Sequence, residues 1–250
     1  MSAEPDVGGL DGSRAHDHWF TLLSVIVPVF NERSTVAELI RRIRAVELPV
    51  DIEVIVVDDG SSDGTDKVLT ALSDSTVRVI DHEYNRGKGA AIRTGLAAAR
   101  GDLVLIQDAD LEYDPFDWPR LLDPILRRKA QVVYGSRFTG ERKNMLPLHW
   151  LGNRFLSLVT NLLYSSTLSD METCYKMFDR RVLEGITIES DRFDFEPEIT
   201  AKILRRGYRI YEVPISYAGR EPDEGKKITW RDGFGALRAL IKFRFTKLDR

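Results

Sequence analysis

The stretch LVLIQDADLEYDP (residues 103–115) passes directly from an apolar run into a cluster of acidic side chains. Such an apolar run is typical of a buried β-strand, in which residues two apart point to the same side. Asp108 and Asp110 are therefore expected to converge at the end of this strand. Neighbouring carboxylates repel unless a proton or cation lies between them, and Mg²⁺ accepts one or two carboxylates together with phosphate oxygens. The stretch predicts either such a metal site or a solvated acidic turn.

Outward from this stretch, apolar runs alternate with helical patterns along the chain. This alternation is typical of βαβ units and a mostly parallel sheet, and continuous apolar strands indicate that helices cover both faces. The predicted strands are LLSVIVPVF, DIEVIVVDD, VRVIDHE, DLVLIQDAD, QVVYGSRF and YRIYEVPISYAGR. The predicted helices are TVAELIRRIRAV, TDKVLTALSD, GKGAAIRTGLAAAR, PFDWPRLLDPILRRK, LGNRFLSLVTNLLYSS, DFEPEITAKILRRG and RDGFGALRALIKFRFTKL. The sequence therefore predicts an α/β fold.

Composition limits the number of domains and the classes of partner. At 250 residues and 43% hydrophobic content, the chain suits one large domain, here residues 22–228, with a disordered tail at 1–21 and a C-terminal helix at 229–250. The formal net charge of −3 gives no reason to expect a nucleic acid partner.

The single Cys174 excludes an intramolecular disulfide. No signal-like segment and no apolar run near the ~20 residues of a membrane span are seen, so we expect a cytoplasmic location.

Polar side chains follow four of the predicted strands. They lie in PVFNE (28–32), DDGSSDGT (58–65), NRGKG (85–89) and QDAD (107–110). Ligands of open α/β sheets bind at the carboxyl ends of the strands, so four polar ends in succession indicate a nucleotide site. NRGKG lacks the G-x-x-x-x-G-K-[ST] spacing of a P-loop, which argues against a kinase or ATPase. Its glycines are equally compatible with a helix that packs closely on the sheet.

Together, SVIVPVFNE, VIVVDDGSSDGT, NRGKGAA and QDADLEYDP resemble the family 2 glycosyltransferases, through about residue 228. Within that family, VVYGSRF, LGNRF, DFEPEITAKILRRGYRIYEVPI and YAGREPDEGKKI are similar to the polyprenyl-phosphate (dolichyl-phosphate) mannose, glucose and N-acetylhexosamine synthases. The resemblance implies a GT-A fold, a Rossmann-like mostly parallel sheet. It also implies a nucleotide-sugar donor, a polyprenyl phosphate acceptor, and Mg²⁺ or Mn²⁺ at the D-x-D.

The resemblance also implies roles for individual residues. Metal ligands would be Asp108, Asp110 and Glu112. Arg137 and Arg154 would receive the acceptor phosphate. Asp170 and Glu196 are weaker catalytic candidates, because acids in such positions are more often structural partners of a nearby basic residue. The donor would be bound by Pro28, Val29, Asn31, Glu32, Asp59, Lys88, Asp108, Ala109, Asp110, Arg220 and Lys226.

The chain departs from the mannose synthases at two places that bear on the sugar. Those enzymes tend to read DADLQHPP and TSGFR where this chain has DADLEYDP and ETCYK. We therefore expect UDP-glucose or a UDP-N-acetylhexosamine as donor, with GDP-mannose close behind.

The resemblance to synthases that use a phosphate acceptor fits a simple mechanism. A phosphate monoester is already anionic, with a second pKa near ~6, so it attacks without a general base, whereas a sugar hydroxyl needs one. We expect single displacement with inversion at the anomeric carbon. The Q-x-x-R-W motif of processive polysaccharide synthases is absent. Two alternatives remain, transfer to a saccharide hydroxyl and a non-catalytic nucleotide-sugar-binding subunit.

The C-terminal segment combines apolar and basic side chains. Phe234, Leu237, Leu240, Ile241 and Phe245 recur at helical spacing, and residues 231–250 contain six cations against two acids. Such a helix is predicted to bind an anionic membrane surface reversibly, and a small membrane partner protein could reinforce the attachment. The enzyme would then be peripheral on the cytoplasmic face. The alternative is a helix docked on the protein's own core.

Overall fold

The computed structural model describes residues 20–143, 145–220 and 230–247. Its centre is a seven-stranded sheet in the order β3-β2-β1-β4-β7-β5-β8, in which only β7 is antiparallel to its neighbours. The strands are β1 (Leu22–Val29), β2 (Asp51–Asp58), β3 (Val77–Asp81), β4 (Leu103–Ile106), β5 (Val132–Ser136), β7 (Lys176–Asp179) and β8 (Ile210–Pro214). The predicted mostly parallel α/β sheet is confirmed.

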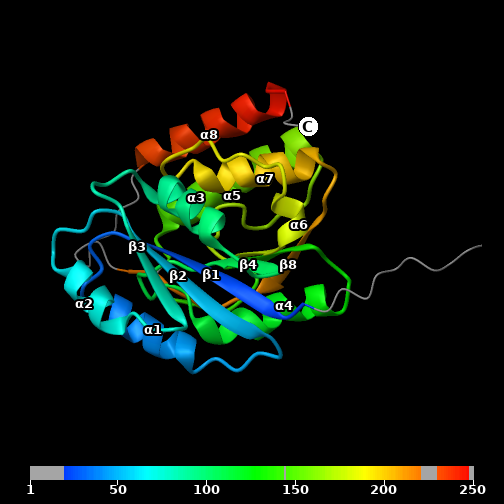
Figure 1. The fold of residues 1–250 in the computed structure, drawn as a ribbon. Coiled ribbons are helices and arrows are strands. Elements are labelled where there is room, and N and C mark those ends of the chain that lie inside the picture. The colour runs from blue at the N-terminus through cyan, green and yellow to red at the C-terminus, as the bar shows by residue number, and fades with distance from the viewer. Residues whose placement is uncertain (1–19, 144, 221–229, 248–250) are drawn as a thin grey trace, which may run out of the picture.

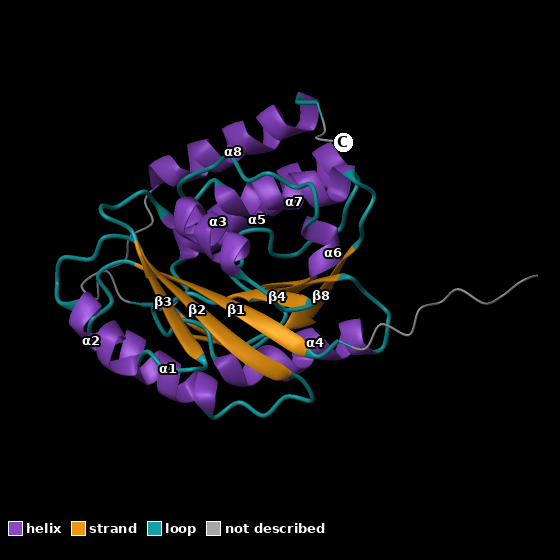
Figure 2. Cartoon of the chain, viewed as in Figure 1, coloured by secondary structure: helices purple, strands orange, loops and turns teal. Residues whose placement is uncertain are grey.

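Helices cover both faces of the sheet and make three layers (Figures 1 and 2). One layer holds α1 (Val36–Arg44), α2 (Thr65–Leu72) and α4 (Trp118–Leu126), the last preceded by the 3₁₀ turn η1 (Pro115–Asp117). The opposite layer holds α3 (Lys88–Ala98), α5 (Pro147–Tyr164), α6 (Arg180–Leu183) and α7 (Phe195–Arg205), with α8 (Trp230–Phe245) outermost. The short strands β6 (Arg142–Lys143) and β9 (Tyr217–Ala218) pair separately.

The core sits between the sheet and these helices because the central strands are apolar on both sides. Ile26 of β1 is fully buried and lies in register with Ile55 of β2 and Ile106 of β4. Helix α3 approaches β1 so closely that a Cβ on Gly95 would collide with the Ile26 side chain. Glycine at this position therefore lets the helix whose first turn carries Lys88 lie directly on the central strand.

The direction of strand crossing changes beside β1. The chain moves from β1 outward to β2 and β3, then returns to add β4 on the other side of β1. Ligands of open α/β sheets bind at the carboxyl ends of the strands at such a switch point. The ends of β1, β2 and β4 are where the polar segments 28–32, 58–65 and 107–110 lie.

Helix α8 is present, but it packs against α5 and α7, as the docked alternative requires. Leu240 and Phe243 are buried, and Arg205 Nη1 donates to the carbonyls of Phe243 and Thr246 at 2.6 Å each. Phe234, Ile241 and Phe245 of the predicted apolar row remain exposed. The helix is therefore part of the domain, and its predicted role as a free membrane-binding segment is not confirmed. Across the ranges described, no helix is both long and apolar enough to cross a bilayer.

We expect Leu240→Ala to lower the free energy of unfolding by about 2–5 kcal/mol, because it opens a cavity between α8, α5 and α7. Phe245→Ala, at a side chain that is 80% exposed, should change it by less than about 0.5 kcal/mol. Urea unfolding followed by circular dichroism measures both. Equal stability of the two variants would mean that α8 detaches in solution.

Candidate active site

The D-x-D acids lie on a turn, not on a strand as expected. β4 ends at Ile106, and the chain then turns with Leu111 at a φ of 63°. Gln107 points into the core, where its Oε1 accepts hydrogen bonds from Tyr175 Oη at 2.6 Å and Trp118 Nε1 at 3.1 Å. The anchored Gln107 and the buried Ala109 leave Asp108 and Asp110 to face away from the core.

Asp110 lies close to two other acids of this turn, Asp108 and Glu112. Burial, followed by the charges of Asp108 and Glu112, raises the pKa of Asp110 to about 7. A cation would relieve this repulsion, so the pair fits Mg²⁺ or Mn²⁺. Glu112, the third predicted ligand, has other partners: its Oε1 accepts from Arg220 N at 2.8 Å and its Oε2 from Tyr217 Oη at 2.9 Å.

Among the residues that the structure describes, no three His, Cys, Asp or Glu side chains converge as a metal-binding group. Asp108 and Asp110 are the two carboxylates that remain, and Mg²⁺ bound by one or two carboxylates completes its shell with waters and substrate phosphates. The site therefore fits a metal held jointly by the protein and a diphosphate, and does not fit a metal caged by protein ligands.

Lys88, in the first turn of α3, joins the acidic turn to α7. Its Nζ lies 2.9 Å from Asp108 Oδ1 and 2.8 Å from Glu196 Oε1. Burial alone would lower the pKa of Lys88, but these two carboxylates hold it well above its usual value. The ammonium is thus permanently charged beside the D-x-D, where it can also meet a donor phosphate.

The glycines around Lys88 are explained by close packing. A Cβ on Gly87 would collide with the carbonyl of Asp191, and one on Gly89 with that of Ser190. Gly87 also has a φ of 101°, which favours glycine. The NRGKG segment is therefore a tight helix start whose glycines pack against the 190–191 loop and not against the sheet, and Lys88 between them stays a predicted donor-binding residue.

The loops after β1 and β2 interlock at the same edge. Asn31 N donates to Ser61 Oγ at 2.9 Å, and Ser62 N donates to Asn31 Oδ1 at 2.8 Å. Asp59 accepts from Arg86 N at 2.9 Å and Gly87 N at 2.7 Å. Asp59 was predicted to bind the nucleotide-sugar donor. These two hydrogen bonds show that it also holds the loop that leads to Lys88.

Arg220, two residues after β9, binds residues of this same edge. Its Nη2 lies 2.7 Å from Glu32 Oε2, and its Nε donates to Asp110 O at 2.9 Å. The predicted donor residues Glu32, Asp110 and Arg220 are thus neighbours, and Pro28 and Val29 end the strand beneath them. Lys226, predicted to act with Arg220, lies outside the described residues.

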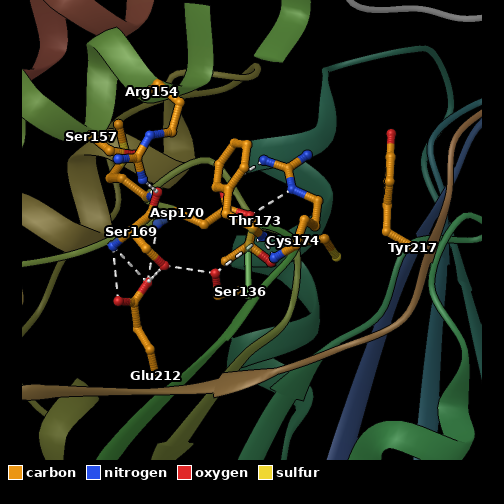
Figure 3. A network of polar contacts seen from close by, with 12 residues as sticks. Ser136, Arg154, Ser157, Ser169, Asp170, Thr173, Cys174, Glu212 and Tyr217 are labelled. Atoms are coloured by element: carbon orange, nitrogen blue, oxygen red, sulfur yellow. Dashed lines mark hydrogen bonds and ion pairs between the residues drawn. The ribbon is translucent and has the colours of Figure 1, made fainter. Parts of the chain in front are cut away.

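Arg137 is buried and its guanidinium is held by Asp170. Nε and Nη2 donate to the two Asp170 oxygens at 2.7 Å each, and Arg137 N donates to Oδ2 at 3.0 Å. Glu212 supports this pair from β8, because its Oε1 accepts from Ser169 N and Asp170 N at 3.0 Å each (Figure 3). Asp170 is therefore an ion-pair partner of Arg137, and its two oxygens are engaged by hydrogen bonds.

Arg154, on α5, is the more accessible of the two predicted phosphate-binding arginines. Its Nη1 donates to Ser169 O at 3.3 Å, and its guanidinium stacks over Phe138, with Cζ 5.5 Å from the ring centroid. Ser169 adjoins Asp170 and Phe138 adjoins Arg137, so the two arginines lie on neighbouring segments. The exposed Arg154 can receive an anion without losing an ion pair.

Sequence reasoning missed several residues that surround the predicted ones. Glu212 and Tyr217 position Asp170 and Glu112, and no local pattern indicates these long-range contacts. Glu172 Oε1, Thr173 Oγ1 and Glu196 Oε2 are buried and have no hydrogen-bond partner in the described part of the chain. Burial, then the charge of Glu196, raises the pKa of Glu172 to about 8. Such oxygens can accept hydrogen bonds from ligand hydroxyl groups, of which a sugar carries several.

The chain is similar to curated proteins named for transfer to polyprenyl phosphates. It is 29% identical to a dodecaprenyl-phosphate galacturonate synthase of Rhizobium johnstonii, over 80% of this chain and 60% of that protein. It is 32% identical to an undecaprenyl-phosphate 4-deoxy-4-formamido-L-arabinose transferase of Pseudomonas aeruginosa, over 82% and 60%. The chain thus spans about 60% of the length of these relatives.

Solved structures show the same fold. Glucosyl-3-phosphoglycerate synthase from Mycobacterium tuberculosis, in complex with Mn²⁺, UDP-glucose and phosphoglyceric acid, superposes with a TM-score of 0.70 over 90% of this chain and 80% of that one, at 23% identity. This likeness confirms the predicted GT-A fold.

The family follows from a match that covers most of the domain. Residues 24–187, which run from β1 past the D-x-D turn and the Arg137–Asp170 pair, match the model described as glycosyl transferase family 2. The chain belongs to glycosyl transferase family 2.

Proposed function

We propose that this chain transfers a hexosyl group from a nucleotide diphosphate sugar to polyprenyl phosphate, with inversion at the anomeric carbon. The donor would be UDP-glucose, a UDP-N-acetylhexosamine or GDP-mannose. The observation that carries the proposal is the pairing of two features: an acidic turn open to a metal–diphosphate, and an exposed arginine beside the buried Arg137. The polyprenyl phosphates in the names of the curated relatives support the acceptor.

On the donor side, Asp108 and Asp110 would hold Mg²⁺ or Mn²⁺. When bound, the metal supplies positive charge to the departing nucleoside diphosphate. Lys88 and Arg220 add fixed cations on either side of the turn, and Lys226 is proposed to join them. Glu32, Asn31 and Asp59, at the ends of β1 and β2, are proposed to hold the nucleoside.

On the acceptor side, the engagement of Asp170 argues for a phosphate and against a hydroxyl. Both Asp170 oxygens accept hydrogen bonds from Arg137, so this carboxylate is poorly placed to remove a proton from a sugar. A phosphate monoester needs no such base. It needs guanidinium groups that fix it in line with the anomeric carbon, a role that fits Arg154 and the remaining Nη1 of Arg137.

A polyprenyl acceptor places the reaction at a membrane surface. We therefore propose that the protein acts as a peripheral enzyme on the cytoplasmic face, where a small membrane partner protein could reinforce its attachment. Anionic lipids would add electrostatic attraction for its exposed cations.

A donor screen tests the proposal directly. We expect the label of one UDP- or GDP-sugar, incubated with the protein, Mg²⁺ and polyprenyl phosphate, to enter an organic extract as a product that mild acid cleaves. A non-catalytic binding subunit would bind the nucleotide sugar without releasing nucleoside diphosphate. Labelled product that stays in the aqueous phase on a saccharide acceptor would favour transfer to a hydroxyl, with Glu196 Oε2 as the candidate base.

Asp108→Asn should reduce turnover by at least a thousandfold, because it removes one of two metal carboxylates. Lys88 keeps its contact with Glu196, so the free energy of unfolding should change by no more than about 1 kcal/mol. Calorimetric titration with Mn²⁺ and the nucleoside diphosphate should show the lost metal affinity, and EDTA should inactivate the wild type. Undiminished transfer in EDTA would contradict the metal assignment.

Arg154→Lys should lower the rate of transfer at least tenfold and leave donor affinity within twofold, because an ammonium cannot present the planar fork to a phosphate. Arg154 is preferable to Arg137 for this test because Arg137 is buried in its ion pair. Arg127→Lys is the matched control, since Arg127 is exposed and pairs with Asp123 on α4. An equal loss of affinity for the nucleotide sugar in Arg154→Lys would show that Arg154 binds the donor diphosphate and not the acceptor phosphate.

A further inference from the structure

Helix α5 carries apolar side chains on two opposite faces. Leu156 and the aliphatic part of Thr160 are buried on one face, against the core shared with α8. On the other face a row of large apolar side chains is 53–75% exposed, and it consists of Leu148, Leu151, Phe155, Leu158 and Leu162. We call this set the α5 row.

The α5 row is continuous along the helix. Its members follow one another at alternating intervals of three and four residues, which places them on one stripe. Single exposed apolar residues are normal on soluble proteins, but a continuous exposed stripe marks an interaction surface. An apolar stripe on a helix is normally covered by a second surface, and the α5 row has no such cover among the described residues.

The charges around the α5 row favour an anionic lipid surface. Residues 142–169 contain Arg142, Lys143 and Arg154 but no Asp or Glu, although the chain has 39 acids. A second copy laid helix to helix on this face would bring two Arg154 side chains near each other with no acid on α5 to pair with them. An anionic leaflet supplies hydrocarbon for the row and phosphates for the cations.

The α5 row is also joined to the proposed acceptor site. Phe138 directly follows Arg137, and the Cζ atoms of Arg154 and Arg142 lie 5.5 Å and 6.0 Å from its ring centroid. The ring of Trp150, on α5, lies 6.3 Å from the same centroid. Tryptophan and arginine are side chains that settle at the headgroup level of a bilayer. We call Phe138, Arg142, Trp150 and Arg154 the Phe138 cluster. It lies where the α5 row meets the two arginines, at the level that lipid headgroups would occupy.

We propose that the α5 row inserts into the acyl chains of the facing leaflet of an anionic bilayer, with Arg142 and Arg154 at the level of the lipid phosphates. The inference rests on the proposed function, since a polyprenyl phosphate in that bilayer would enter at the Phe138 cluster. It assigns the lipid contact to α5, and gives the docked helix α8 the role of supporting α5 from behind.

The test is sedimentation of the protein with vesicles of phosphatidylcholine and phosphatidylglycerol, without substrates. The double variant Leu158→Glu, Leu162→Glu should bind at least tenfold more weakly than wild type, because it removes apolar contact and adds like charge. Both side chains are more than half exposed, so folding should persist, and Leu158→Gln, Leu162→Gln provides a neutral second variant. Phe116→Glu is the matched control, since Phe116 is 57% exposed on η1 and should bind as wild type does.

Three outcomes would overturn the inference. The first is that wild type does not sediment with the vesicles, and the second is that the row variants bind as well as wild type. The third is a wild-type dimer that the row variants dissociate, which would make the row an interface between copies. Transfer to a short-chain, water-soluble prenyl phosphate separates this test from the proposed function. The inference expects that transfer to be unchanged in the row variants, whereas its absence in wild type would contradict the function and not the surface.

Discussion

The site depends on one buried ammonium group. Lys88 lies between Asp108, on the turn after β4, and Glu196, on α7, and so fixes the acidic turn against the C-terminal half of the chain. Removing the ammonium itself would cost roughly 3–5 kcal/mol, because it leaves two carboxylates without a compensating cation. The packing of α3 on β1 through Gly95 and of the Gly87–Gly89 turn on the 190–191 loop holds this ammonium in place.

A chain of hydrogen bonds that ends in an ion pair holds the predicted acceptor side of the site. Glu212 of β8 binds the backbone of Ser169 and Asp170, and Asp170 in turn binds Arg137. Each carboxylate in this chain accepts hydrogen bonds from the next residue, so the orientation of the buried Arg137 guanidinium is fixed before any ligand binds. Two groups of charged side chains, the Lys88–Asp108–Glu196 set and the Arg137–Asp170 pair, are therefore held in place by the fold. Fixed charge needs no rearrangement to meet a ligand's charge.

The sequence predicted the parallel strands, because buried strands appear as continuous apolar runs. It indicated a candidate site at their carboxyl ends, where the ligands of open α/β sheets bind. It did not predict β7, since KMFD is short and places a lysine and an aspartate in the sheet. The D-x-D geometry was inferred from strand alternation, but the strand ends two residues earlier. Glu212 was missed because its partners are 42 and 43 residues away. Helical periodicity revealed an apolar face on α8 without showing what covers it.

The antiparallel strand β7 has a consequence for how the chain acquires its structure during synthesis. β1 to β4 pair with one another early, but β5 must wait for β7 and finally for β8, which begins at Ile210. Because synthesis runs from the N-terminus, the partners of β5 emerge last. An emerging chain therefore completes the acidic half while Glu196, Glu212 and Arg220 are still to come. A product that stops before these residues would contain Lys88 and Asp108 but would lack Glu196, which binds the Lys88 ammonium, and Glu212, which supports the Arg137–Asp170 pair.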